Sequence, residues 1–298
     1  MQWDAEQIAM NNYAIKTFFS VPMSGGRRVR YNPCHFEGRK GVRIIFRKLA
    51  TGENEHWLNE FACWVTSPIM PPFNKPPYNN NCHSEIVMDI AEGCTVRIGT
   101  MYKQGEETVD AEGNTVRDDK GKPVISWKPG KLFIHEVTKE ENVKYQQFKH
   151  YAPPFILPTS REAETRMLCF ALRNLGAPFD VMAYKMRAVL PITPGVHFYD
   201  PVENHVNAEK PPNREYFCAQ LTHLCGQAAA FETNRVRNAP TYVGQGSKIT
   251  RKTWADAMFD YSATTATPNG FFITLSTMPD VKSDSSRPDQ HFSKIGRM

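Results

Sequence analysis

The stretch CHSEIVMDIAEGCTVRIGTM, from Cys82 to Met101, carries the clearest strand signals in this chain of 298 residues. Apolar residues dominate its first half, and after the Glu92-Gly93 turn the second half is again rich in Val, Ile and Thr. Two such runs joined by a short turn that contains glycine are typical of a β-hairpin. The sequence therefore predicts two antiparallel strands, over 82–90 and 94–101.

Further elements are predicted on both sides of this hairpin from apolar runs, helical spacing and turn residues. The strands are expected over 42–46 and 131–137, and the helices over 163–175 and 217–231, with less clear helices over 3–20 and 179–190. A short apolar element over 61–65 leads into a rigid, proline-rich loop over 67–81. Residues 103–127 are polar with two turn signals, which predicts an elaborated hairpin loop.

These elements indicate one central α+β domain with an extension at each end. The domain is expected over 40–262, with a hairpin insertion over 103–130. Residues 1–39 are interpreted as an N-terminal extension and residues 263–298 as a C-terminal one. The stretch from about 277, with its polar run Ser283 to Ser286, is expected to be disordered or bound to a partner.

Composition excludes several classes of protein. The chain is 41% hydrophobic and 22% charged, which is sufficient to bury a core. No stretch approaches about eighteen consecutive apolar residues, so no transmembrane segment is predicted. The first residues carry acids where a signal peptide carries basic residues, so secretion is not expected. These features favour a cytoplasmic or other intracellular location.

The net charge of +5 is dispersed except for one basic cluster, Arg27-Arg28-Val29-Arg30. Such a cluster fits contact with nucleic acid or with an acidic partner, but it also fits a solvated loop. The solvated loop is the favoured interpretation, because no aromatic-interleaved or zinc-finger pattern accompanies the arginines. Nucleic acid is therefore an unlikely partner on the sequence, with Arg27, Arg28 and Arg30 as the residues that would contact it.

The seven cysteines are odd in number and irregularly spaced, so a disulfide framework is not expected. No Cys-x-x-Cys, Walker A, Gly-x-Gly-x-x-Gly or His-Glu-x-x-His pattern occurs, and no metal or cofactor is predicted. Only weak metal signals remain, at Cys34-His35, Cys82-His83 and His223-x-Cys225.

Cys218 lies in the first turn of the predicted helix over 217–231. The partial positive charge and free amides of a helix N-terminus stabilise a thiolate, and the same amides can hold an oxyanion. Cys218 is therefore the candidate nucleophile, although a small buried hydrophobic residue is the alternative interpretation. Cys225, two turns deeper in the helix, is assigned to the core.

A nucleophilic cysteine needs a base, and His83 is the best candidate because it begins an apolar strand directly after a rigid loop. Residues two apart on a strand share a face, so Glu85 is placed to orient the imidazole as the third member of a triad. Alternatively, Glu85 is only a charge at a strand end. His35, next to Glu37 in a loop rich in Gly and Arg, is a distant second candidate base.

Three segments carry a resemblance: Cys82 to Val87, Phe133 to Thr138 with the later Leu175 to Asp180, and Tyr216 to Leu221. Together they resemble the circularly permuted papain-like cysteine hydrolases, relatives of the NlpC-type peptidoglycan amidases and of lecithin retinol acyltransferase. The matching motifs are a Ser-His-x-x-hydrophobic strand, a strand and helix followed by Gly-x-Pro-Tyr-Asp, and a Phe-Cys-Ser-Glu-Leu helix start. The order, His before Cys, is the permuted arrangement.

The resemblance covers about 40–232 and implies a permuted papain-like fold, in which an antiparallel sheet packs against the helix that bears the nucleophile. It implies a thiol hydrolase, as a cysteine protease, amidase or acyl hydrolase, with Cys218 as nucleophile and His83 as base. The chain departs from the family at Ala219 and Gln220. The strand after the histidine offers Thr95, Arg97 and Thr100 where the family commonly has its third polar residue, so Glu85 substitutes for it or the triad is incomplete.

The alternative function is a structural or interaction protein that keeps this fold without strong catalysis. The chain also resembles proteins encoded by large DNA viruses, which implies a virion or capsid-associated location and other virion proteins as partners. Thiol reactivity separates the two functions, because only the enzyme needs a reactive Cys218.

Overall fold

The computed structural model describes residues 20–23, 26–32, 39–48, 81–101, 103–141, 151–180, 215–236, 253–258 and 266–283. The predicted helices over 3–20 and 179–190, the apolar element over 61–65 and the proline-rich loop over 67–81 lie outside these residues except at their edges. Cys34 and His35 lie outside them as well.

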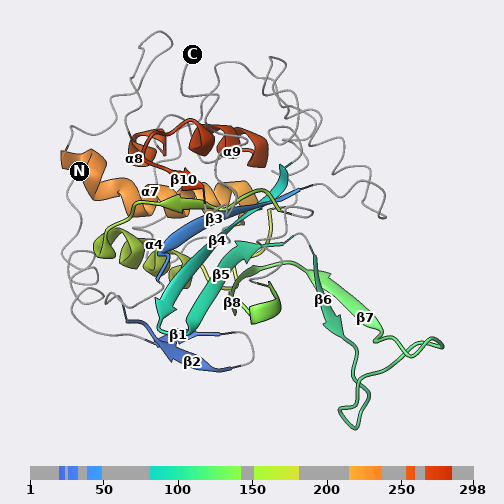
Figure 1. Cartoon of the computed structure of the whole chain (residues 1–298). Coiled ribbons are helices and arrows are strands. Elements are labelled where there is room, and N and C mark those ends of the chain that lie inside the picture. The colour runs from blue at the N-terminus through green and yellow to red at the C-terminus, as the bar shows by residue number, and fades with distance from the viewer. Residues whose placement is uncertain are drawn as a thin grey trace.

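A six-stranded sheet, antiparallel throughout, forms the centre of the fold (Figure 1). In spatial order its strands are β10 (Lys282–Ser283), β9 (Phe155–Leu157), β3 (Val42–Lys48), β4 (Asn81–Ala91), β5 (Cys94–Thr100) and β8 (Leu132–Glu136). The predicted hairpin is confirmed as β4 and β5, and the strands predicted over 42–46 and 131–137 are confirmed as β3 and β8.

The two faces of β4 have different neighbours. On one face, Ile86 pairs with Ile44 of β3 and Ile98 of β5, and all three side chains are buried in the main core. β-branched side chains pack well on such a pleated surface, which explains the stable pairing of these strands. Because side chains alternate along a strand, His83 and Glu85 project from the opposite face.

Besides a helical turn at residues 139–141, four helices accompany the sheet in the described part of the chain: α4 (Arg161–Arg173), α7 (Cys218–Val236), α8 (Trp254–Ala257) and α9 (Pro268–Ser276). α7 and α9 pack on β4, and α4 packs against α7 (Figure 1). The predicted helices over 163–175 and 217–231 are confirmed, with α4 capped by the Ser160 hydroxyl, which accepts a hydrogen bond from Ala163 N. None of the described helices has the length and apolar character needed to cross a membrane.

The broad expectation of an antiparallel sheet packed against the helix that carries Cys218 is thus confirmed. Within the C-terminal extension expected from 263, residues 268–283 pack against the central sheet. Phe271 and Phe272 of α9 are fully buried, and the Phe272 ring lies 5.2 Å from Phe46 and 5.1 Å from Phe155. β10 pairs with β9 at the edge of the sheet. Burial of these aromatic rings stabilises the contact between α9 and the sheet.

Residues 20–23 and 26–32, within the N-terminal extension expected over 1–39, also contact the central domain. β1 (Ser20–Pro22) and β2 (Arg28–Arg30) form a two-stranded ribbon. Tyr31, which follows it, is fully buried, and its hydroxyl lies 3.2 Å from Thr165 Oγ1 of α4. Asn32 N donates to Ile90 O at 2.8 Å, which joins this segment to the end of β4.

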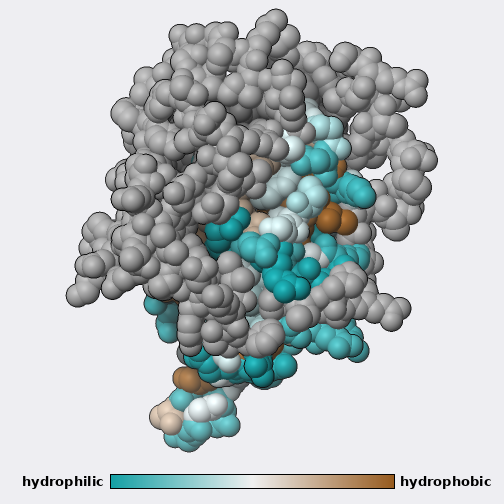
Figure 2. All heavy atoms as spheres, turned by 90° about the vertical axis from the view of Figure 1, so that its left-hand side faces the viewer, coloured by the Kyte–Doolittle hydropathy of each residue, from teal (hydrophilic) through white to brown (hydrophobic). Residues whose placement is uncertain are grey.

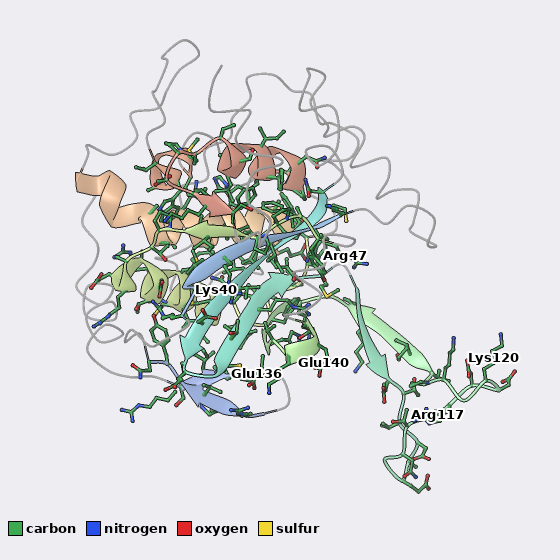
Figure 3. The ribbon with its side chains drawn as sticks, in the orientation of Figure 1. Lys40, Arg47, Arg117, Lys120, Glu136 and Glu140 are labelled. Atoms are coloured by element: carbon green, nitrogen blue, oxygen red, sulfur yellow. The ribbon has the colours of Figure 1, made fainter. Side chains whose placement is uncertain are left out.

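Residues 103–130 form an arm between β5 and β8. β6 (Lys103–Glu107) and β7 (Ile125–Pro129) pair with each other and extend away from the central sheet (Figure 1). Arg117 and Lys120 lie far out on the arm (Figure 3). Two tight turns there require positive φ, at Gly113 and Gly121, and each turn is closed by hydrogen bonds to an aspartate side chain.

Candidate active site

Cys218 is the first residue of α7, and the segment before it is held in place by backbone hydrogen bonds. Tyr216 N donates to Pro178 O at 3.0 Å, and Asp180 N donates to Tyr216 O at 3.2 Å. The Tyr216 hydroxyl donates to Asn174 Oδ1 at 2.8 Å, at the end of α4. The structure therefore brings the 175–180 segment alongside the start of the helix that carries Cys218.

The same segment also joins the sheet. Leu132 N of β8 donates to Ala177 O at 2.8 Å, and Gly176 N donates to Leu132 O at 3.0 Å. Gly176 has a φ of 82°, a left-handed conformation that favours glycine. The N-terminus of α7 is thus fixed relative to β8 through this short segment.

The structure brings together the three residues that the sequence singled out. The His83 Nε2–H donates to Glu85 Oε1 at 2.8 Å, along one face of β4. Cys218 lies close enough to His83 to affect the charge of the imidazole. Because Nε2 is engaged by Glu85, Nδ1 is the ring nitrogen that is available for another group. The order of groups is therefore thiol, imidazole and carboxylate.

The charges of this site favour a protonated His83 beside an ionised Glu85. Burial alone would lower the pKa of His83, but the facing Cys218 and Glu85 outweigh it and raise that pKa well above its ordinary value. Burial likewise opposes ionisation of Glu85, yet His83, Arg97 and Arg47 hold the pKa of its carboxyl below the usual range. A protonated imidazole next to a thiol is the arrangement that stabilises a thiolate.

The site is mostly enclosed. Cys218 is 3% exposed, and the side chains of Glu85 and His83 are 5% and 19% exposed. Low access of water strengthens the electrostatic interaction between the three groups. In this conformation the imidazole is the most exposed of the three side chains.

Of the three polar residues that β5 offers, Arg97 is the one that contacts the site. Its Nε lies 3.6 Å from Glu85 Oε2, whereas the Thr95 hydroxyl donates to Asp89 Oδ1 at 2.7 Å. Sequence reasoning considered Arg97 only as a replacement for a carboxylate or histidine. The register of the hairpin, which pairs Val87 with Arg97, is the signal that places Arg97 next to Glu85.

A hydroxyl pair connects the two elements that carry the site. Ser84 lies between His83 and Glu85 on β4, and its Oγ donates to Thr222 Oγ1 at 3.2 Å. The Thr222 hydroxyl lies 2.8 Å from the carbonyl oxygen of Cys218, to which it donates. Sequence analysis did not identify Thr222, although its position one helical turn after Cys218 was available as a signal.

Other candidates from the sequence have structural positions. His223 is buried and its Nε2 lies 2.9 Å from Met258 O, and Cys225 is fully buried as expected for the core. In the basic cluster, Arg27 pairs with Glu136 at 2.8 Å and Arg28 donates to Ser20 O. Within the described part of the chain, no group of three or more His, Cys, Asp or Glu side chains is arranged to hold a metal ion.

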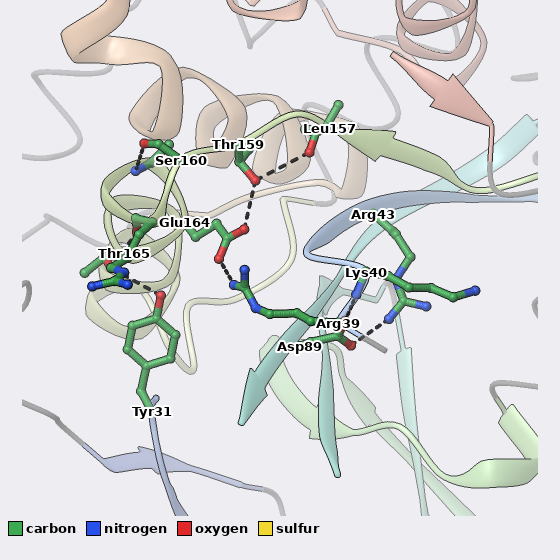
Figure 4. A network of polar contacts seen from close by, with 12 residues as sticks. Tyr31, Arg39, Lys40, Arg43, Asp89, Leu157, Thr159, Ser160, Glu164 and Thr165 are labelled. Carbon is green, nitrogen blue, oxygen red and sulfur yellow. Dashed lines mark hydrogen bonds and ion pairs between the residues drawn. The ribbon is translucent and has the colours of Figure 1, made fainter. Parts of the chain in front are cut away.

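A second set of buried charges, here called the Arg39–Asp89 network, lies near the N-terminal segment (Figure 4). Arg39 pairs with Glu164 of α4, and Glu164 also accepts a hydrogen bond from the Thr159 hydroxyl at 3.0 Å. Arg43 pairs with Asp89 at 2.9 Å, and Asp89 accepts a further bond from Lys40 N. These carboxylates accept hydrogen bonds from arginines, hydroxyls and a backbone amide, and the thiol of Cys94 lies within electrostatic reach of Asp89.

Comparison with protein-family models, with curated proteins and with solved structures found no match for this chain.

Proposed function

We propose that the protein is a thiol hydrolase that cleaves an amide, peptide or ester bond. The observation that carries this proposal is the arrangement of three side chains, in which His83 is hydrogen-bonded to Glu85 at 2.8 Å and lies close enough to Cys218 for the two groups to interact electrostatically. A nucleophile, a base and a group that orients the base are the components of covalent acyl transfer. The position of Cys218 at the start of a helix of 19 residues adds backbone N–H donors.

In the first half of the proposed reaction, the Cys218 thiolate attacks the carbonyl carbon of the substrate. A C–S bond forms, and the negative charge moves to the carbonyl oxygen, which the amides of the first turn of α7 stabilise. His83 then gives its proton to the leaving amine or alcohol as the C–N or C–O bond breaks. The product of this half is a thioester on Cys218.

In the second half, water replaces the leaving group. Neutral His83 takes a proton from water as the oxygen attacks the thioester carbon, and the C–S bond then breaks. This step releases the carboxylic acid product and restores the thiolate and the imidazolium. Throughout both halves, Glu85 holds the imidazole ring by its 2.8 Å hydrogen bond and stabilises the charged form.

We propose further that the domain has the permuted papain-like arrangement. The support is the order of the elements: the strand with His83 precedes the helix that begins with Cys218, and the 175–180 segment lies beside the start of that helix. These are the three segments on which the resemblance rests.

The proposal is tested with p-nitrophenyl acetate and the full chain. Wild type is expected to release p-nitrophenolate in a burst and to carry an acetyl group on Cys218, as measured by mass spectrometry of the peptides. His83→Ala is expected to lose the burst, and Cys218→Ala to lose both signals. Acetylation that favours other cysteines, or that is equal in wild type and His83→Ala, would overturn the hydrolase function.

A second candidate function is the interaction protein, including a role in a virus particle. The arm favours it, because three large hydrophobic side chains are exposed there: Val109, Val124 and Ile125. Figure 2 shows a face on which the described surface is mainly hydrophilic, with hydrophobic residues in small separate spots. Sedimentation of wild type and Val109→Lys/Ile125→Lys tests the simplest form, self-association. Identical monomers at all concentrations would contradict that form.

A further inference from the structure

The two oxygens of the Glu85 carboxylate have different partners. Oε1 accepts the hydrogen bond from His83 at 2.8 Å, whereas Oε2 lies 3.6 Å from Nε of Arg97 on the neighbouring strand β5. One carboxylate therefore lies between an imidazole and a guanidinium. At 5% exposure it has little access to water as a competing partner.

Arg97 is itself fixed by two further contacts. Its guanidinium carbon lies 5.2 Å from the centre of the Phe133 ring on β8, in cation–π geometry. Its Nη1 lies 3.6 Å from Glu141 Oε1, just after β8. A planar guanidinium suits this combination of stacking and pairing better than a lysine ammonium does.

The neighbouring Gly99 leaves room for this arrangement. A Cβ at position 99 would lie 3.0 Å from Glu85 Cγ and Oε1 and equally close to Phe133 Cζ. Real Cβ atoms seldom approach so closely, so a side chain at Gly99 would push Glu85 or Phe133 aside. The hairpin therefore provides both the cation and the space that the carboxylate occupies.

We infer that Arg97 is a positioning residue of the Cys218 site, which holds the Glu85 carboxylate ionised and directed at His83. This inference rests on the proposed function. It also gives a role to Arg97, which lies on the strand where the family that the sequence resembles commonly has its third polar residue. The carboxylate comes from the histidine's own strand, and the next strand supplies a cation that holds the carboxylate.

The groups that face Glu85 determine the expected pH effect. They are His83 on the same strand, Arg47 of β3, Arg97 of β5 and Cys218 of α7 through His83, with His135 of β8 and Tyr151 within electrostatic reach. Burial raises the pKa of Glu85, and His83, Arg97 and Arg47 lower it. Without Arg97 the pKa of Glu85 rises, so on acidification its carboxylate becomes protonated at a higher pH. The imidazolium of His83, and through it the thiolate, then lose electrostatic stabilisation at that higher pH as well.

The test is the rate of Cys218 alkylation by iodoacetamide between about pH 4 and pH 9, which spans the ordinary pKa values of carboxylates, imidazoles and thiols. Wild type, Arg97→Gln, Glu85→Gln and the double variant are compared by peptide mass spectrometry. The acid limb of this profile is the pH range over which alkylation slows on acidification. In Arg97→Gln it is expected to move up by about one pH unit, because a neighbouring opposite charge lowers the pKa of a carboxyl by at least about that much. The double variant is expected to match Glu85→Gln, because Arg97 acts through that carboxylate.

Two controls keep the result specific. Arg43→Gln removes another buried arginine from a carboxylate, Asp89, and is expected to leave the acid limb unchanged. Arg97→Lys keeps the charge and is expected to show only part of the shift that Arg97→Gln causes.

If Arg97→Gln does not fold, Phe133→Leu removes the ring under the guanidinium and is expected to shift the acid limb in the same direction.

Different outcomes overturn the two proposals. The role of Arg97 would be overturned if Glu85→Gln altered the pH profile but Arg97→Gln kept the acid limb of wild type. It would also be overturned if the shifts of the two single variants added in the double variant. An unchanged Cys218 profile in both Glu85→Gln and His83→Ala would instead overturn the hydrolase site itself.

Discussion

The active-site network, made up of Cys218, His83, Glu85 and Arg97, and the Arg39–Asp89 network both bury a glutamate beside an arginine, yet the pKa values of the two glutamates shift in opposite directions. Burial dominates at Glu164 and raises the pKa of its carboxyl in spite of the pairing with Arg39. At Glu85, burial is outweighed by His83, Arg97 and Arg47, and the pKa is lowered. Glu85 therefore stays charged beside a group that can itself change charge.

The partners explain why one network is structural and the other is a candidate for catalysis. In the Arg39–Asp89 network the charges neutralise each other and connect residues 39–43 to α4 and β4. In the active-site network the line of contacts continues through His83 to a thiol at a helix N-terminus. We therefore expect substitutions in the first network to change stability and substitutions in the second to change the reactivity of Cys218.

The largest expected effect is on stability, in Arg39→Met. Removal of one partner from a buried ion pair typically costs about 3 kcal/mol or more, and Glu164 has a side-chain exposure of only 2%. A group whose folded-state pKa is raised destabilises the fold as pH rises through that pKa. The loss in the free energy of unfolding should therefore be larger at mildly alkaline pH than at acidic pH, as measured by urea denaturation.

Arg27→Met is the matched control for this experiment. Arg27 pairs with Glu136 at 2.8 Å, but its side chain is 64% exposed, and exposed pairs contribute about 1 kcal/mol or less. Equal, small losses in both variants would mean that the Arg39–Asp89 network is not a stabilising one.

The next effect is on reactivity and compares Glu85→Gln with Glu164→Gln. Loss of the Glu85 charge removes support from the imidazolium, and a change of about one pKa unit corresponds to a tenfold change in the thiolate population. Alkylation of Cys218 at mildly acidic pH should therefore slow by about tenfold in Glu85→Gln and stay unchanged in Glu164→Gln. An equal slowing in both variants would show that the two networks do not differ in function.

Local sequence patterns were sufficient to predict the framework of the site. Alternation along β4 placed His83 and Glu85 on one face, and the helix start at Cys218 followed from apolar spacing in α7. The sequence did not indicate that Phe271 and Phe272 join the core, because their partners Phe46 and Phe155 lie far away in the chain.

The roles of Arg97 and Thr222 were missed for a related reason. Each depends on the pairing of two elements, β4 with β5 for Arg97 and β4 with α7 for Thr222. A one-dimensional pattern shows which face a residue occupies, but it does not show which residue of another element lies opposite.

A smaller effect is expected from Gly99→Ala. The added Cβ would displace Glu85, so we expect Cys218 alkylation to slow several-fold, short of the tenfold change that one pKa unit represents. Gly226→Ala is the control, because its Cβ meets the flexible side chain of Met258 in the core below the site. That variant should lose about 1–3 kcal/mol of stability while keeping the pH profile of Cys218. The opposite pattern, with a changed profile only in Gly226→Ala, would contradict the assigned role of Gly99.

The pairing of His83 with Cys218 is the central claim, and the pH dependence of iodoacetamide alkylation in wild type and His83→Ala tests it most directly. Cys169 of α4 serves as the internal reference, because burial raises the pKa of its thiol to about 11 and it should react only under alkaline conditions in both proteins. In wild type, Cys218 is expected to be alkylated much faster than Cys169 at neutral pH. In His83→Ala that advantage should be lost, with Cys169 unchanged. If Cys218 has the same profile in both proteins, the thiolate–imidazolium pair does not exist and the hydrolase account is wrong.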